Sequence, residues 1–247
     1  MTALAPEELK ACCSSAYASA AARFLLGDSF HPGGAALTHR LAAALGVGPG
    51  SVVADVACGP GTSAIRLAEE TGCKVVGIDL EPPSDSGHPR VRFVRGDAEA
   101  LPLPDGSVDG VLCECALCTF PDKAAAAREI VRVLRPGGRL ALSDVTAVRE
   151  RLPAELTTLE ARVACIADAR PLEEIAALFE DAGLTVETIE HHDEALAALL
   201  ERVDSRLRLV GMLDQVLPVA RGRELVAAAR AALAGGALGY ASLVARK

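Results

Sequence analysis

The sequence contains no tryptophan, and aromatic residues make up only 3% of its 247 positions. The hydrophobic core must therefore be built from aliphatic and alanine side chains, which is possible because 51% of the residues are hydrophobic. Clusters of lysine and arginine are also missing, and the formal net charge is −8. Because nucleic-acid binding needs basic clusters that neutralise phosphates, this balance excludes a nucleic-acid partner and favours a small molecule.

Long apolar runs are absent as well. No stretch approaches the roughly 20 residues that a membrane-spanning helix needs, and no cleavage pattern follows the alanine-rich N-terminus. We therefore expect a soluble cytoplasmic protein without a signal peptide or a membrane span. In a reducing compartment the eight cysteines are expected to be free thiols and not a disulfide framework. The oligomeric state stays open.

From residue 51 onward, short aliphatic runs alternate with longer helical patterns. The predicted strands cover residues 52–57, 74–80, 91–96, 108–113, 139–145, 184–190 and 238–245. The predicted helices between them cover about 62–70, 122–134, 153–169 and 171–182. Continuous apolar strands joined by helices indicate an α/β fold, with a doubly wound, mostly parallel sheet covered on both faces. We expect this domain to span residues 51–247, with a helical insertion at about 194–237.

A glycine-containing loop joins the first predicted strand to the first predicted helix at residues 55–62 (DVACGPGT). Its small residues let a ligand approach the backbone, and the start of the helix presents free N–H groups. Asp79 follows Gly61 by 18 positions and ends the second predicted strand. A carboxylate there can accept hydrogen bonds from both hydroxyls of a ribose. The pattern predicts a nucleoside-containing cofactor and fits an NAD-binding oxidoreductase as one alternative.

The N-terminal 50 residues are predicted to be helical and to end at the turn at residues 48–50. Within them, the run at residues 27–34 (GDSFHPGG) is predicted to be a loop. Because this segment precedes the nucleotide-binding core, we expect it to lie over the pocket as a lid.

Three features distinguish the readings of the glycine loop. The loop lies about 50 residues into the chain, and Asp55 precedes it at a position suited to orienting a ligand ammonium group. The third predicted strand ends in residues 96–102 (GDAEALP), and residues 134–138 (LRPGG) precede the fifth. This combination resembles class I S-adenosylmethionine-dependent methyltransferases, nearest their quinone-biosynthesis and arsenite methyltransferase branch. The resemblance covers residues 46–145 closely.

The resemblance implies a seven-stranded sheet in the order 3-2-1-4-5-7-6 and S-adenosylmethionine as the cofactor. It implies that the glycine loop contacts the methionine part, that Asp79 holds the ribose, and that Asp97 and the Ala98 N–H recognise the adenine. No metal is required. The cofactor-binding residues we expect are Tyr17, Asp55, Ala57, Gly59, Gly61, Thr62, Asp79, Leu80, Asp97, Ala98 and Glu114.

The acceptor is expected just beyond the fourth predicted strand, at residues 113–122 (CECALCTFPD). The resembled family often carries Asn and His there, whereas this sequence has Glu114 and Cys118. This sequence further resembles arsenite methyltransferases in having N-terminal cysteines and another cysteine after the fifth strand. No cysteine follows Cys165, so the further C-terminal thiol expected in that family is missing. The candidate acceptor-site residues are Cys12, Cys13, His31, Cys115, Cys118 and Cys165. Cysteines that only pack in the core are the alternative.

The leading hypothesis is transfer of a methyl group from S-adenosylmethionine to a small-molecule acceptor by in-line displacement. The sulfonium leaving group is already activated by its charge, so the protein mainly supplies alignment and water exclusion. The acceptor is either a soft one, such as arsenite or a thiol, or an O, N or C nucleophile of an organic metabolite such as a quinone or natural product. A non-catalytic S-adenosylmethionine-binding module is a further alternative.

Overall fold

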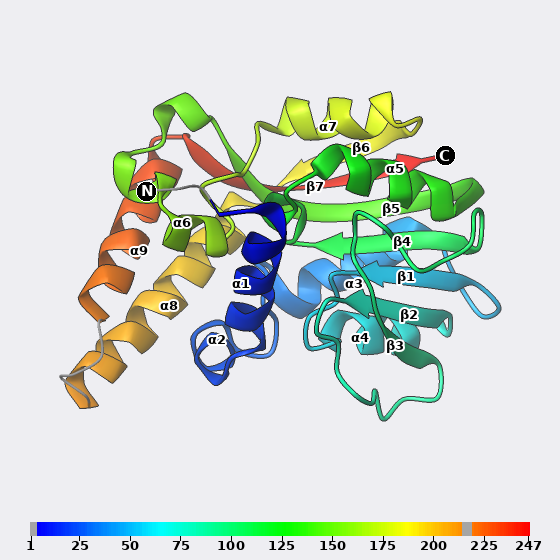
Figure 1. The fold of residues 1–247 in the computed structure, drawn as a ribbon, viewed down its shortest axis with the longest axis horizontal. Helices are drawn as coiled ribbons and strands as arrows, with labels where there is room; N and C mark the ends of the chain where they lie inside the picture. The colour runs from blue at the N-terminus through cyan, green and yellow to red at the C-terminus, as the bar shows by residue number, and fades with distance from the viewer. Residues whose placement is uncertain (1–3, 214–218) are drawn as a thin grey trace.

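The computed structural model describes residues 4–213 and 219–247. Residues 1–3 of the expected lid and 214–218 of the expected insertion lie outside the described residues. Within the described residues, seven strands form one sheet in the order β3-β2-β1-β4-β5-β7-β6 (Figure 1). They are β1 (Val52–Val56), β2 (Lys74–Asp79), β3 (Val91–Arg95), β4 (Val108–Glu114), β5 (Leu134–Ala147), β6 (Thr185–His191) and β7 (Leu238–Arg246). β7 runs antiparallel to both of its neighbours. The predicted fold class and strand order are confirmed.

Helices cover both faces of this sheet. They are α1 (Pro6–Ala18), α2 (Ala20–Leu26), α3 (Gly34–Leu45), α4 (Thr62–Thr71), α5 (Lys123–Val133), α6 (Leu159–Val163), α7 (Leu172–Asp181), α8 (Asp193–Leu213) and α9 (Val219–Ala234). One buried cluster joins α3, α4, α8 and α9 to one face, and a second joins α5 and α7 to the other. The two clusters form the aliphatic core expected from the composition. None of the described helices is both long and apolar enough to cross a membrane.

The direction of chain growth reverses at β1. From β1 the chain adds β2 and β3 on one side, and then returns to place β4 on the other. The loops that follow β1 and β4 therefore diverge at the carboxyl edge of the sheet and leave a crevice, which is where open α/β sheets bind ligands. Figure 1 shows α1, in blue, beside this edge.

The predicted helix at residues 153–169 is wrong. The structure has a 3₁₀ turn at η3 (Ala154–Thr157), and then the short helix α6. The Thr158 hydroxyl accepts a hydrogen bond from the N–H of Ala161 and so begins a new helix in the middle of the apolar pattern. The chain then leaves the helical conformation at Cys165, whose φ is +64°. The apolar periodicity of the sequence continues past Thr158, although this capping residue begins a separate helix there.

The fifth strand begins earlier than predicted. β5 begins at Leu134, directly after α5, and not at residue 139. The pairing between β4 and β5 shifts in register between Val108 and Gly110, so residues 135–138 bulge out of the ladder. Gly137 permits this with a φ of +80°. Most of the predicted insertion at 194–237 is occupied by α8 and α9; the division of the chain into lid and domain stays a prediction.

Candidate cofactor and acceptor site

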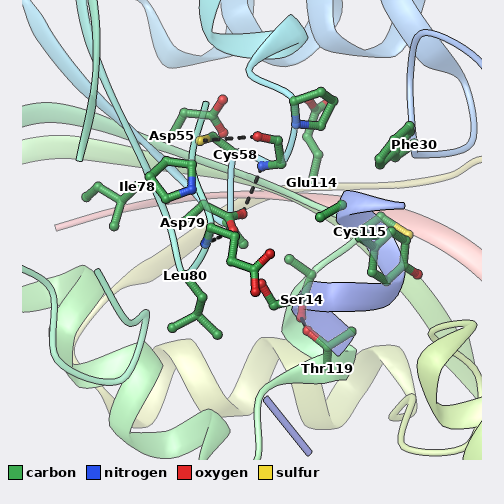
Figure 2. A pocket seen from close by; sticks show the side chains of 18 of the residues that line it. Ser14, Phe30, Asp55, Cys58, Ile78, Asp79, Leu80, Glu114, Cys115 and Thr119 are labelled. Atoms are coloured by element: carbon green, nitrogen blue, oxygen red, sulfur yellow. Dashed lines mark hydrogen bonds between the residues drawn. The ribbon is translucent and has the colours of Figure 1, made fainter. Parts of the chain in front are cut away.

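A cavity of about 300 Å³ lies at the carboxyl ends of β1, β2 and β4 (Figure 2). Side chains from α1 and from the loop at residues 28–31 complete its wall, so the N-terminal segment contributes directly to the cavity. The predicted site residues that line it are Cys13, Tyr17, His31, Asp55, Ala57, Gly59, Thr62, Asp79, Leu80, Asp97, Ala98, Glu114 and Cys115. The predicted residues outside this lining are Cys12, Gly61, Cys118 and Cys165.

The two glycines of the loop have different roles. Both adopt positive φ angles, +51° at Gly59 and +77° at Gly61. A Cβ at Gly59 would meet no described atom within 4 Å, so open space lies beside its backbone. A Cβ at Gly61 would lie 2.1 Å from Cζ of Phe93. Gly59 therefore leaves room for a ligand, whereas Gly61 is required for packing against β3.

Asp79 joins the glycine loop to the end of β2. Its Oδ2 accepts a hydrogen bond from the N–H of Gly59 at 2.9 Å, and its Oδ1 accepts one from Glu81 at the same distance (Figure 2). Each carboxylate oxygen has a second lone pair. Asp79 can therefore hold the loop in place and still accept hydrogen bonds from a ribose.

Asp55 carries a buried carboxylate oxygen that lacks a partner. The residue is 2% exposed, and its Oδ2 makes no hydrogen bond with the described residues. Burial, together with the nearby charges of Glu114 and Asp79, raises the pKa of Asp55 well above its usual range. Because native proteins rarely leave such an atom unpaired, this oxygen fits a ligand ammonium group, as the sequence suggested.

Glu114 lies at the centre of a buried polar cluster. Its carboxylate accepts hydrogen bonds from Ser63 at 2.6 Å and from Thr38 at 3.1 Å, and lies 3.4 Å from Nε2 of His31. The other ring nitrogen of His31 lies 3.1 Å from the carbonyl oxygen of Pro32. Both ring nitrogens of His31 are thus engaged, which favours anchoring of the loop at residues 28–31 over proton transfer with an acceptor.

The cavity is strongly acidic. Its carboxylates outnumber its cationic side chains three to one: Asp28, Asp55, Asp79, Glu81, Asp97 and Glu114 against Lys10 and Arg23. Such a field attracts a ligand with a positive sulfonium and ammonium group and opposes one that carries two phosphates. The charge distribution therefore argues against the NAD alternative.

Lys10 of α1 was missed by the sequence reasoning. Its Nζ donates to Asp97 at 2.7 Å and to Glu99 at 2.6 Å. Although burial opposes the charged form, these two hydrogen bonds raise the pKa of Lys10 above its usual value. The ion pairs connect α1 to the loop after β3, where the adenine is expected. A single lysine on a helix gives no sequence signal for a contact 87 positions away.

Three cysteines, Cys115, Cys118 and Cys165, lie together at one wall of the cavity, which Cys115 lines. The Sγ of Cys165 lies 3.0 Å from the hydroxyl of Tyr17 and 3.5 Å from the carbonyl oxygen of Cys115. Hydrogen bonds from the thiols of Cys115 and Cys118 hold the pKa of Cys165 well below its usual value. Burial raises the pKa of Cys13 to about 11. Among the described residues, no group of three or more His, Cys, Asp or Glu side chains is arranged to hold a metal ion.

Comparison with known proteins agrees with this geometry. Residues 54–142 match the family model described as a methyltransferase domain. The chain carries a class I S-adenosylmethionine-dependent methyltransferase domain. The match confirms the family resemblance and the cofactor that it implied.

Three characterised relatives illustrate the range of proteins that share this methyltransferase domain. Methyltransferase GfsG of Streptomyces halstedii is 36% identical over 170 residues, which are 64% of this chain and 61% of that protein. The 27-O-demethylrifamycin SV methyltransferase of Amycolatopsis mediterranei is 37% identical, over 62% of this chain and 61% of that protein. The arsenite methyltransferase of Halobacterium salinarum is 29% identical, over 60% of this chain and 40% of that protein. The chain thus spans about three-fifths or less of these relatives.

Solved structures show the same fold. The [4+2]-cyclase SpnF superposes with a TM-score of 0.77 at 21% identity, over 100% of this chain and 97% of that one. Phosphoethanolamine N-methyltransferase 2 of Haemonchus contortus, bound to S-adenosyl-L-methionine, gives 0.75 at 19% identity, over 92% and 56%. At sequence identities this low, the comparison shows a shared fold and nothing more.

Proposed function

We propose that the protein transfers the methyl group of S-adenosylmethionine to a small organic metabolite bound beside Tyr17, Phe30 and Cys115. The observation that carries this proposal is the unpaired Oδ2 of Asp55 within an acidic cavity at the carboxyl edge of the sheet. When bound, the cofactor supplies a methyl group on a positively charged sulfur, which needs no further activation.

The residues of the chain then have distinct tasks. Asp55 accepts hydrogen bonds from the ammonium group, and the open backbone at Gly59 accommodates the methionine part. Asp79 accepts hydrogen bonds from the ribose, and Asp97 with the N–H of Ala98 recognises the adenine. The N-terminal segment excludes water through α1, which Lys10 holds against the loop after β3.

An organic acceptor is supported by the aromatic part of the cavity wall. The rings of Tyr17 and Phe30 lie 6.1 Å apart, and both line the cavity together with Thr119 and Phe120. Aromatic side chains with a few polar groups are typical of sites for organic metabolites. A relative named for a rifamycin substrate is consistent with such an acceptor.

A soft acceptor is the second candidate, and the contact of Cys165 with Tyr17 and Cys115 supports it. Thiolates bind soft ions such as arsenic(III). Of these thiols, Cys115 and Cys13 reach the cavity, whereas Cys118 and Cys165 lie behind it. A soft acceptor would therefore have to draw the buried thiols toward the cavity, which an organic acceptor does not require.

The test is methyl transfer from labelled S-adenosylmethionine to a panel of acceptors, after calorimetric titration with the cofactor and with NAD. The panel contains quinols, hydroxylated macrolactones, small thiols and arsenite with a thiol reductant. We expect binding of S-adenosylmethionine but not of NAD, and labelled product from an organic acceptor. Product from arsenite that disappears in Cys165→Ser and Cys115→Ser would establish the second candidate. Cofactor binding without product from any acceptor would indicate a non-catalytic module.

A further inference from the structure

Buried polar atoms without a partner gather at two places in the described residues. They are Ser14 Oγ, Asp55 Oδ2, Arg162 Nε and Arg170 Nε. Ser14 and Asp55 line the cofactor cavity. The two arginines lie elsewhere, in the segment between β5 and α7. An unpaired buried polar group costs about 1–3 kcal/mol. Such groups occur both at the cofactor cavity and at this second place, so the second place needs an explanation as well.

The second place is an arginine cluster around Asp168, made of Arg149, Arg162 and Arg170. Oδ2 of Asp168 lies 3.2 Å from Arg162 and 2.6 Å from Nζ of Lys123. Its Oδ1 lies 3.9 Å from both Arg149 and Arg170. One buried carboxylate thus faces four cationic side chains.

The charges in the arginine cluster do not balance. Glu174, 3.5 Å from Arg170, is the other carboxylate that contacts these side chains among the described residues. Four cations against two carboxylates leave two positive charges, in a protein with a formal net charge of −8. Like charges brought this close repel one another unless an anion joins them.

The backbone under the arginine cluster is fixed. The carbonyl oxygen of Arg170 accepts a hydrogen bond from the N–H of Ala147, which extends the pairing of β5. Thr158 caps the helix that carries Arg162, and Lys123 is buried, where it donates to the carbonyl oxygen of Phe120. The three arginine side chains remain 32–46% exposed. The guanidinium groups are therefore positioned by rigid backbone and open to a ligand from solvent.

We propose that Arg149, Arg162 and Arg170 bind a doubly charged oxyanion of the phosphate class on the solvent side of Asp168. Guanidinium groups bind phosphate oxygens through paired N–H donors, and the exposed parts of the three arginine side chains supply such donors on this side. A phosphate dianion balances both excess charges, whereas a carboxylate balances one. The site is separate from the proposed methyl transfer and does not depend on it.

The test is calorimetric titration with inorganic phosphate at constant ionic strength. We expect wild type to bind phosphate, and Arg149→Gln and Arg170→Gln each to weaken binding about tenfold, the value of one charge-assisted hydrogen bond. Arg170→Lys keeps the positive charge but loses the paired N–H donors of the guanidinium group. Its affinity for phosphate should lie between those of wild type and Arg170→Gln. The matched control is Arg135→Gln, since Arg135 is also 46% exposed and pairs with one carboxylate, Asp109. We expect this control to bind as wild type does.

The same titration identifies the source of the phosphate group. Phosphoethanolamine and ethanolamine are tested as competitors of phosphate. Displacement by phosphoethanolamine at a lower concentration than inorganic phosphate itself supports a phosphate carried by a larger molecule, and equal potency supports the free ion. Absence of phosphate binding by wild type would overturn the proposal. So would undiminished binding by the Arg149→Gln/Arg170→Gln double variant, or an equal loss in Arg135→Gln.

Discussion

Replacing Asp55 by Asn should separate the folding cost of a buried carboxylate from its contribution to ligand binding. The pKa of Asp55 is raised in the folded protein, chiefly by burial. For such a group, the stability that comes from the protonated form is complete below the unfolded pKa and is lost as the pH rises through the folded pKa. Without ligand, Asp55→Asn should therefore be more stable than wild type at neutral pH, and the difference should shrink as the pH falls from neutral to about 4 and stay constant below that.

The magnitude follows from the buried charge. Each unit by which burial raises the pKa of Asp55 corresponds to about 1.4 kcal/mol, which for a chain of this length is roughly 3–6 °C in unfolding temperature. The effect on ligand binding has the opposite sign. Loss of a charge-assisted hydrogen bond to the ammonium group costs about 1.5–3 kcal/mol, so affinity for S-adenosylmethionine should fall about 10- to 100-fold.

Two measurements on the same Asp55→Asn preparation check this reasoning. Thermal unfolding between pH 4 and 8 gives the stability difference, and calorimetry with S-adenosylmethionine gives the affinity. Asp28→Asn is the matched control, because Asp28 lines the same cavity but is exposed. The reasoning is refuted if Asp55→Asn binds the cofactor as tightly as wild type, or if its unfolding temperature at neutral pH is unchanged or lower.

Three further predictions follow from the site. Gly59→Val should lose cofactor binding and lower the unfolding temperature only through its φ of +51°, whereas Gly61→Val should unfold at a still lower temperature because its side chain also meets Phe93; normal cofactor affinity in Gly59→Val would contradict this. Lys10→Met should speed protease cleavage of the N-terminal segment and weaken cofactor binding, and unchanged cleavage would argue against a lid. Burial raises the pKa of Asp144 to about 7, so its contribution makes stability fall as the pH rises from about 4 to 7; Asp144→Asn should reduce the slope in that range and leave the part due to Asp55, and slopes equal to those of wild type would refute the assignment.

The sequence predicted those features that local patterns encode. The strands followed from apolar runs, and their order was implied by the resemblance to class I methyltransferases. Asp55 and Asp79 could be found because each lies at the end of such a run. The helix at residues 153–169 was predicted wrongly because apolar periodicity does not reveal that Thr158 caps a new helix.

Contacts between distant parts of the chain were beyond the sequence. Lys10 and Asp97 are 87 positions apart, and Cys165 and Cys115 are 50 apart. Such pairs depend on how helices pack over the sheet, which the local pattern of one sequence does not specify. The sequence placed Cys115 and Cys118 together just beyond the fourth predicted strand, and the structure adds Cys165 to them.

The strained residues bear on what the cysteines do. Among the described residues, the non-glycine residues with positive φ are Ala57, Cys115 and Cys165. Ala57 and Cys115 line the cavity, and Cys165 contacts Cys115 from behind. Each such conformation costs on the order of 1–3 kcal/mol and persists only where the surroundings fix it. A core cysteine that merely fills space needs no such backbone. The strain therefore favours Cys115 and Cys165 as residues that shape the acceptor wall, whichever acceptor binds there.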